Sequence, residues 1–251
     1  MLKVTEVRAK SILNKSKVFD YCVNPYTGCE HSCAYCYAAL FMRRYSGHSE
    51  PWGKFVDVKV NAPELLKKQL VKAKKGTVWV ASVCDPYQPL EERYQLTRKC
   101  LEELAEQQFP VNIQTKSALI LRDLDVLQEF NEIQVGFTIA TDEERMRQLF
   151  EPKASPIQAR LDALEKIRQK GIRTFAFIGP ILPGNPKKLV GSLEGKVDEI
   201  LIDRMNYVSS LRKFYHQHNL IHASTDRFFD EYRRELVEEL KKRRMQFSVL
   251  F

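Results

Sequence analysis

The sequence TVWVASVCDPYQPLEERYQLTRKCLEELAEQQFPVNIQT, residues 77–115, contains a complete β-α-β pattern. Residues 77–83 and 111–115 are rich in β-branched side chains and each predict a strand. Between them, residues 91–107 carry apolar side chains at helical spacing, which predicts an amphipathic helix. A strand, a helix and a second strand in this order are typical of a parallel sheet covered by helices.

The same alternation continues on both sides of this stretch. We predict further strands at residues 21–24, 133–139, 172–178 and 199–202, and helices directly after the cluster of cysteines and at residues 63–75, 122–130, 156–170 and 226–244. These make about six β-α units, too few for the eight units of a closed barrel. The sequence therefore predicts an α/β fold, a partial (open) TIM-type barrel.

No repeat, low-complexity tract or Gly/Ser linker divides the chain, so we expect residues 1–251 to form a single domain. Its core would span about residues 20–207, followed by a C-terminal helix and an apolar tail in residues 208–251. The helix at 156–170 has the clearest boundaries. We expect Ser155 to cap its first turn, Gln158 to complete a capping box and Gly171 to end it.

Composition excludes several classes of protein. Apolar residues make up 44% of the 251 residues, far too many for a disordered chain. No apolar run approaches the ~20 residues needed to cross a bilayer, and the first 19 residues carry charges throughout, so we expect a cytoplasmic protein without a membrane partner. The net charge of +8 is compatible with nucleic acid as a partner, although the basic residues are not concentrated in one segment.

Three of the six cysteines lie in the segment NPYTGCEHSCAYCYA, residues 24–38, with the spacing C-x3-C-x2-C. In a reducing compartment, Cys29, Cys33 and Cys36 are expected to hold metal rather than form disulfides. A four-iron cluster held by three thiolates keeps one iron open for a further ligand. The alternative is a structural zinc site with His31 or Cys22 as the fourth ligand.

Other polar segments follow the predicted strands at their carboxyl ends, where barrel enzymes place their chemistry. These segments are CDPYQPLE (84–91), TKS (115–117), residues 138–141, GPILPG (179–184) and residues 203–207. Asp and Pro also favour ordinary turns, and Thr is common in any strand. Structural roles for these residues therefore remain open at this point.

The cysteine motif, with Tyr35 just before its last cysteine, resembles that of the radical S-adenosylmethionine (radical SAM) superfamily. Together with DPYQPLE, TKSALILRD, LFEPKASP followed by Arg160, and GPILPG, it is similar to the spore photoproduct lyase-like branch from Ser11 to about Tyr207. The resemblance implies a radical SAM core with a 4Fe–4S cluster on Cys29, Cys33 and Cys36. It also implies S-adenosylmethionine on the open iron.

What the resemblance implies for the chemistry is reductive cleavage of S-adenosylmethionine to a 5′-deoxyadenosyl radical, which abstracts hydrogen from a substrate. An electron donor such as flavodoxin or ferredoxin would be the partner. The residues expected to bind the cofactor are Tyr35 and Tyr37 at the adenosyl group, Lys116 at the methionine carboxylate, Thr138, Ser82, and Asp85 with Gln88 in the adjacent loop. The catalytic candidates are Cys84 and Tyr87.

In spore photoproduct lyases, the resemblance places a hydrogen-donating cysteine three residues before the acid of the second-strand loop. Here that position is Ser82, whose O–H bond is too strong to quench a carbon radical at a useful rate. Cys84 could replace the missing donor if the strand at 77–83 continued far enough for both residues to share a face. We therefore expect a substrate other than spore photoproduct.

Two functions follow from these observations. The first is a radical SAM enzyme with an unidentified substrate, nucleic acid being the first candidate. The second is a non-catalytic zinc or iron–sulfur binding module that holds nucleic acid on a basic surface.

Overall fold

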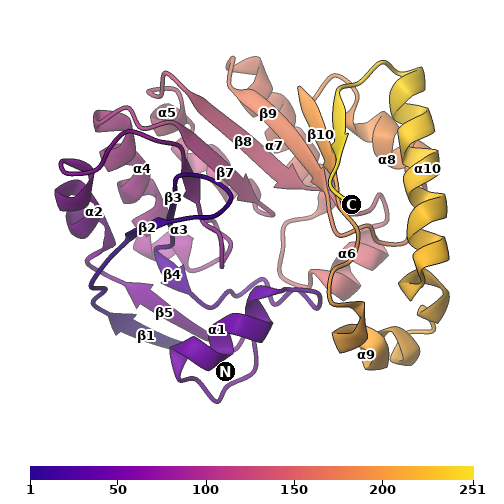
Figure 1. Ribbon diagram of the computed structural model, residues 1–251, viewed down its shortest axis with the longest axis horizontal. Coiled ribbons are helices and arrows are strands. Elements are labelled where there is room, and N and C mark those ends of the chain that lie inside the picture. The colour runs from indigo at the N-terminus through magenta and orange to yellow at the C-terminus, as the bar shows by residue number, and fades with distance from the viewer.

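The computed structural model describes residues 1–251, except for the side chains of residues 43–45. Its main feature is a curved eight-stranded sheet with the strand order β11-β10-β9-β8-β7-β6-β3-β2 (Figure 1). β2 pairs antiparallel with β3 at one edge, and the other neighbours pair in parallel. The strands are β2 (Leu13–Lys15), β3 (Tyr21–Val23), β6 (Val78–Val80), β7 (Val111–Thr115), β8 (Ile133–Thr138), β9 (Arg173–Ile178), β10 (Glu199–Ile202) and β11 (Phe247–Val249).

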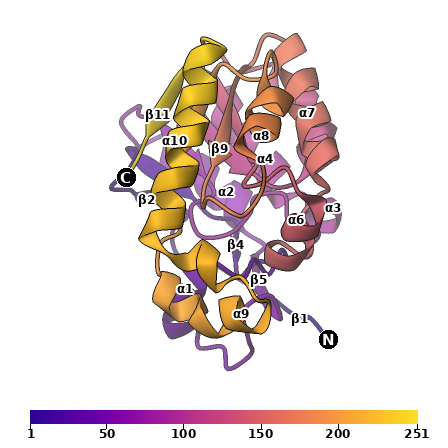
Figure 2. The same ribbon diagram turned by 90° about the vertical axis from the view of Figure 1, so that its right-hand side faces the viewer.

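Because β2 and β11 are the two ends of this order, the sheet is an open barrel. Helices cover its outer face, where α8 packs on α10 and α2 packs on α4 (Figures 1 and 2). The helices are α1 (Ala38–Ser46), α2 (Ala62–Leu70), α3 (Glu91–Tyr94), α4 (Leu96–Glu106), α5 (Leu124–Leu127), α6 (Glu144–Phe150), α7 (Ile157–Gln169), α8 (Pro186–Leu193), α9 (Arg212–Gln217) and α10 (Asp226–Lys242). Three 3-10 helices complete the set, namely η1 (Ala118–Asp123), η2 (Val208–Leu211) and η3 (Ile221–Ser224).

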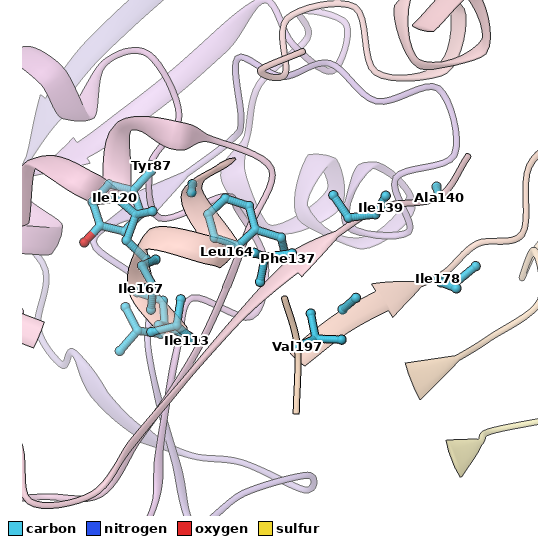
Figure 3. Packing of buried hydrophobic residues seen from close by; sticks show 14 of the residues in the cluster. Tyr87, Ile113, Ile120, Phe137, Ile139, Ala140, Leu164, Ile167, Ile178 and Val197 are labelled. Atoms are coloured by element: carbon cyan, nitrogen blue, oxygen red, sulfur yellow. The ribbon is translucent and has the colours of Figure 1, made fainter. Parts of the chain in front are cut away.

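The sheet and its helices enclose the main hydrophobic core. Figure 3 shows part of this core, where Phe137 of β8 lies close to Leu164 of α7. Gly136 makes room for the ring of Phe175 on the neighbouring strand, because a Cβ atom at Gly136 would lie 2.1 Å from that ring. This contact packs β8 closely against β9.

The six predicted strands are confirmed as β3, β6, β7, β8, β9 and β10. Five further strands lie outside the predictions, and one of them is β2, which pairs antiparallel with β3. A separate sheet forms in the order β1-β5-β4 from β1 (Lys3–Val7), β5 (Phe55–Lys59) and β4 (Tyr26–Thr27). The expected apolar tail contributes β11, because residues 247–249 pair with β10 at the open edge of the barrel.

Two helix predictions were wrong in detail. The helix expected at 91–107 is divided at Gln95, whose φ of +52° is left-handed, into α3 and α4. The carboxylate of Glu91 accepts hydrogen bonds from the backbone N–H groups of Thr97 and Arg98, so it caps α4 and makes the break favourable. The helix expected at 122–130 consists of η1 and the short α5.

The capping box predicted for the helix at 156–170 does not form. The N-cap of α7 is Pro156, and the Ser155 hydroxyl instead accepts a hydrogen bond from the N–H of Ala118. The carboxylate of Glu144 in α6 accepts the N–H of Ile157. Glu144 of α6 therefore caps α7 in place of Ser155. No helix in the part of the chain that the structure describes is long and apolar enough to cross a membrane.

Candidate active site

Asp85 joins three loops at the carboxyl ends of the strands. Its carboxylate follows β6 and accepts hydrogen bonds from the Thr115 hydroxyl at 2.6 Å and from the Lys116 N–H at 2.8 Å, at the end of β7. Nδ1 of His31, in the cysteine loop, lies 3.2 Å from Oδ2 of Asp85. Burial alone would raise the pKa of Asp85, but the charges of His31 and Lys116 lower it by more, so its pKa lies below the ordinary value and the group is an anion at neutral pH.

The cysteine loop, residues 28–37, connects β4 to α1, and Gln88 holds it by two hydrogen bonds. This fully buried side chain accepts the N–H of Glu30 at 2.9 Å and donates to the carbonyl of Gly28 at 3.3 Å. Gly28 has a φ of +91°, and a Cβ atom there would lie 2.4 Å from the carbonyl oxygen of Phe55. Asp85 and Gln88 thus bind the protein's own loops, which makes them supports of the site.

Cys29 and Cys33 are buried, Cys36 is half-buried, and all three are free thiols. Burial raises the pKa of each thiol, and Lys116 lowers the pKa of Cys33 and Cys36. Buried thiolates need a positive charge close by, and bound iron supplies one. Among the described side chains, no group of three or more His, Cys, Asp or Glu is already gathered around one point as metal ligands. The donor set of three thiols on one buried loop nevertheless fits an iron–sulfur cluster.

Tyr35 and Lys116 meet beside these cysteines. The ammonium of Lys116 lies 5.8 Å from the centre of the Tyr35 ring and, among the described side chains, forms no hydrogen bond or ion pair. Burial lowers the pKa of Lys116, but Cys33, Glu151 and Asp85 raise it more, so the side chain carries a charge. An unpaired, partly buried cation of this kind is suited to an anionic ligand.

Tyr37, Ser82 and Cys84 lie on the other side of the loop. The hydroxyl of Tyr37, a largely exposed residue, donates to the carbonyl of Ser82, and Asn24 Nδ2 donates to the Ser82 hydroxyl at 3.1 Å. β6 ends at Val80, so the strand does not continue to Cys84 and the alternation of faces does not relate Cys84 to Ser82. Cys84 is a half-buried loop thiol whose pKa burial raises to about 12.

Thr138 and Tyr87 are buried inside the protein and do not face the surface of the site. Both are fully buried, and the Thr138 hydroxyl accepts a hydrogen bond from Gln114 at 3.0 Å. Figure 3 shows the Tyr87 ring beside Ile120 in the hydrophobic core. Tyr87 therefore has no exposed surface to offer a substrate. Cys100 is a fully buried thiol of α4, and Cys22 is a half-buried thiol of β3.

Sequence reasoning missed the part played by two buried charges, Glu151 and Arg160. Their side chains are each 1% exposed and form an ion pair of 2.6 Å. Glu151 also accepts a hydrogen bond from the Tyr35 hydroxyl. The segment LFEPKASP with Arg160 carries a family resemblance, but no local pattern in it indicates which residues its charged side chains will contact.

The family model of the Radical SAM superfamily matches residues 23–193. An uncharacterized protein of Methanocaldococcus jannaschii is 32% identical over 251 residues, which cover 96% of this chain and 95% of that protein. A protein of Pseudomonas phage M6, named Radical SAM Nalpha-GlyT isomerase, is 26% identical over 64% of this chain and 33% of its own length. The chain also spans about half the length of relatives from Acidianus two-tailed virus and from mycobacteria.

Among solved structures, a spore photoproduct lyase mutant with bound AdoMet and dinucleoside spore photoproduct has the same fold. The two superpose with a TM-score of 0.71 at 16% sequence identity, over 100% of this chain and 82% of that one. At this level of identity, the likeness concerns the arrangement of the strands and helices.

Proposed function

Since the chain belongs to the radical SAM superfamily, we propose that Cys29, Cys33 and Cys36 hold a 4Fe–4S cluster that binds S-adenosylmethionine. Once reduced by an external donor, such a cluster would supply the one electron that cleaves the sulfonium of S-adenosylmethionine to methionine and a 5′-deoxyadenosyl radical, and this radical would abstract hydrogen from a substrate. The observation that carries the proposal is the loop of three free thiols beside the ammonium of Lys116, which has no hydrogen bond or ion pair among the described side chains.

The chain's own residues would bind and orient the cofactor. Lys116 would donate to the methionine carboxylate, because it is the cation at this site without a partner in the described side chains. Tyr35 and Tyr37 flank Cys36 and would lie against the adenosyl group. Asp85 and Gln88 would keep the cysteine loop in place through the contacts described above. Thr138 would support the floor of the site from β8.

Nucleic acid is the substrate class that we propose first. The net charge of +8 favours a polyanion, and a solved enzyme of the same fold holds a dinucleoside spore photoproduct. The reductant would be a small electron-transfer protein such as flavodoxin or ferredoxin. We place the protein in the cytoplasm, where free thiols persist.

Repair of spore photoproduct itself is not the activity that we propose. Ser82 stands where the resemblance puts the hydrogen-donating cysteine, and Cys84 lies in a loop rather than on the same strand. The reduced enzyme should therefore not convert a dinucleoside spore photoproduct back into its two thymidine units. Repair over several turnovers that disappears in Cys84→Ala would make Cys84 the donor and overturn this statement.

Metal analysis distinguishes this proposal from its alternative, a non-catalytic module that holds nucleic acid. Protein purified without oxygen should be brown, contain about four irons per chain, and release 5′-deoxyadenosine from S-adenosylmethionine after reduction with dithionite. A colourless protein with one zinc per chain would favour the alternative. Transfer of deuterium from labelled candidate substrates into 5′-deoxyadenosine would then identify the substrate.

A further inference from the structure

A buried triad of Tyr35, Glu151 and Arg160 lies directly against the cysteine loop. The Tyr35 hydroxyl donates to Oε1 of Glu151, and Oε2 of Glu151 lies 2.6 Å from Nη2 of Arg160. Arg160 is itself held by two carbonyl groups, since its Nε donates to Ser155 at 2.8 Å and its Nη1 to Thr138 at 2.9 Å. The carboxylate is therefore fixed on both oxygens, and its position is set by α7 and the end of β8.

Residues 150–160, which include Glu151 and Arg160, also contact the cysteine loop and Lys116, the two parts of the site expected beside the cofactor. The Ala34 N–H donates to the carbonyl of Phe150 at 2.8 Å, so the loop is tied to the end of α6 between Cys33 and Cys36. The Ser155 N–H donates to the carbonyl of Lys116 at 3.0 Å. Residues 150–160 thus connect the ring of Tyr35 to the backbone of Lys116.

Among the described charged side chains around Tyr35, Lys116 is a cation that forms no ion pair. Arg160 is paired with Glu151, and Asp85 faces His31, while Lys116 has the Tyr35 ring as its described neighbour at 5.8 Å. A change at Glu151 would release the Tyr35 hydroxyl and leave Arg160 unpaired. Both events would alter the surroundings of the Lys116 ammonium without touching a cysteine.

We propose that Glu151 is a positioning residue for S-adenosylmethionine, which acts through Tyr35 and holds that ring and the Lys116 ammonium in the arrangement that receives the cofactor. This inference rests on the function proposed above. Glu151 lies in the LFEPKASP segment, which thereby takes part in binding the cofactor.

A second triad of the same residue types, in which the arginine is 23% exposed, provides a control. The Tyr26 hydroxyl donates to Glu91, and Glu91 forms an ion pair of 2.9 Å with Arg122. Tyr26 and Glu91 are also fully buried, but this triad lies at the start of the cysteine loop, and its carboxylate caps α4. None of its described contacts reaches Lys116. Its loss should weaken the fold without changing the cofactor site.

The experiment compares Glu151→Gln, Tyr35→Phe, their double variant and Glu91→Gln, each loaded with iron and sulfide. Calorimetry measures the affinity for S-adenosylmethionine, and iron content, cluster absorption and thermal midpoint are recorded for each protein. Groups that orient a binding group typically contribute 10–100-fold, so Glu151→Gln should bind about 10-fold or more weakly with unchanged iron content. Tyr35→Phe should bind at least about 3-fold more weakly, and the double variant no more weakly than Glu151→Gln, because the two residues act as one unit.

Glu91→Gln should lower the thermal midpoint yet bind within about 2-fold of the wild type, since its triad does not reach the cofactor site. Unchanged affinity in Glu151→Gln, equal weakening in Glu91→Gln, or independent losses in the double variant would each overturn the inference. If Glu151→Gln does not fold, unchanged affinity in Tyr35→Phe overturns it. A wild-type protein that takes up no iron or binds no S-adenosylmethionine contradicts the proposed function instead.

Discussion

Replacing Lys116 by Met should weaken the binding of S-adenosylmethionine while leaving the cluster intact. Met keeps most of the apolar stem of Lys but removes the ammonium, which has no hydrogen bond or ion pair with the described side chains. A hydrogen bond between charged groups contributes about 1.5–3 kcal/mol, which corresponds to roughly 10- to 150-fold in affinity. Glu151 already offsets part of this positive charge, so we expect a value in the lower half of that range.

The assay is calorimetric titration of S-adenosylmethionine into cluster-loaded protein, with iron content and the visible spectrum as checks. Lys196→Met is the matched control, because Lys196 is a partly exposed lysine that pairs with Glu165 near the amino end of β10, at the opposite edge of the sheet. It should bind as the wild type does. Equal affinities for Lys116→Met and the wild type would refute the assignment of the ammonium to the carboxylate. Loss of iron in Lys116→Met would mean that the lysine supports the cluster.

Three further outcomes test other parts of the structure. Cys33→Ala should lose the cluster and the cleavage of S-adenosylmethionine together, whereas Cys100→Ala, in the core of α4, should keep both by iron assay and 5′-deoxyadenosine release. Gly136→Ala should lower the free energy of unfolding by about 1–3 kcal/mol in urea, because its Cβ atom would overlap the ring of Phe175; an unchanged midpoint would contradict this packing. Burial raises the pKa of Glu151, but its arginine partner lowers it below the ordinary value, so this group's stabilisation is present at neutral pH and lost as the pH falls below about 4. Acid titrations of stability should accordingly be flatter for Glu151→Gln than for the wild type.

The order of elements along the chain was predictable because it depends on local patterns. Alternating strands and amphipathic helices indicated six parallel strands, and all six are present. The C-x3-C-x2-C spacing indicated the cysteine loop, since three thiols within eight residues of one segment need no tertiary information to be recognised. The loops after β6 and β7, which contain Asp85 and Lys116, were expected to lie together because the carboxyl ends of parallel strands meet at one edge, and the two residues are hydrogen-bonded.

Contacts between distant segments were beyond the reach of these patterns. The tail at 247–249 becomes β11 only because β10 offers an open edge, and the break at Gln95 is favoured because Glu91 caps α4. The capping box at Ser155 does not form for the same reason, because the Ser155 hydroxyl accepts a hydrogen bond from the distant Ala118 N–H.

At the candidate site, local sequence and tertiary structure determine different things. Local sequence determined which residues can bind metal and a carboxylate, because these are properties of single side chains. Tertiary structure alone decided that Asp85 and Gln88 support the loop, that Tyr87 lies in the core, and that Glu151 joins Tyr35 to Arg160. Tyr35 and Glu151 are 116 residues apart, and the energy of pairing them arises only after folding has brought the end of α6 beside the cysteine loop.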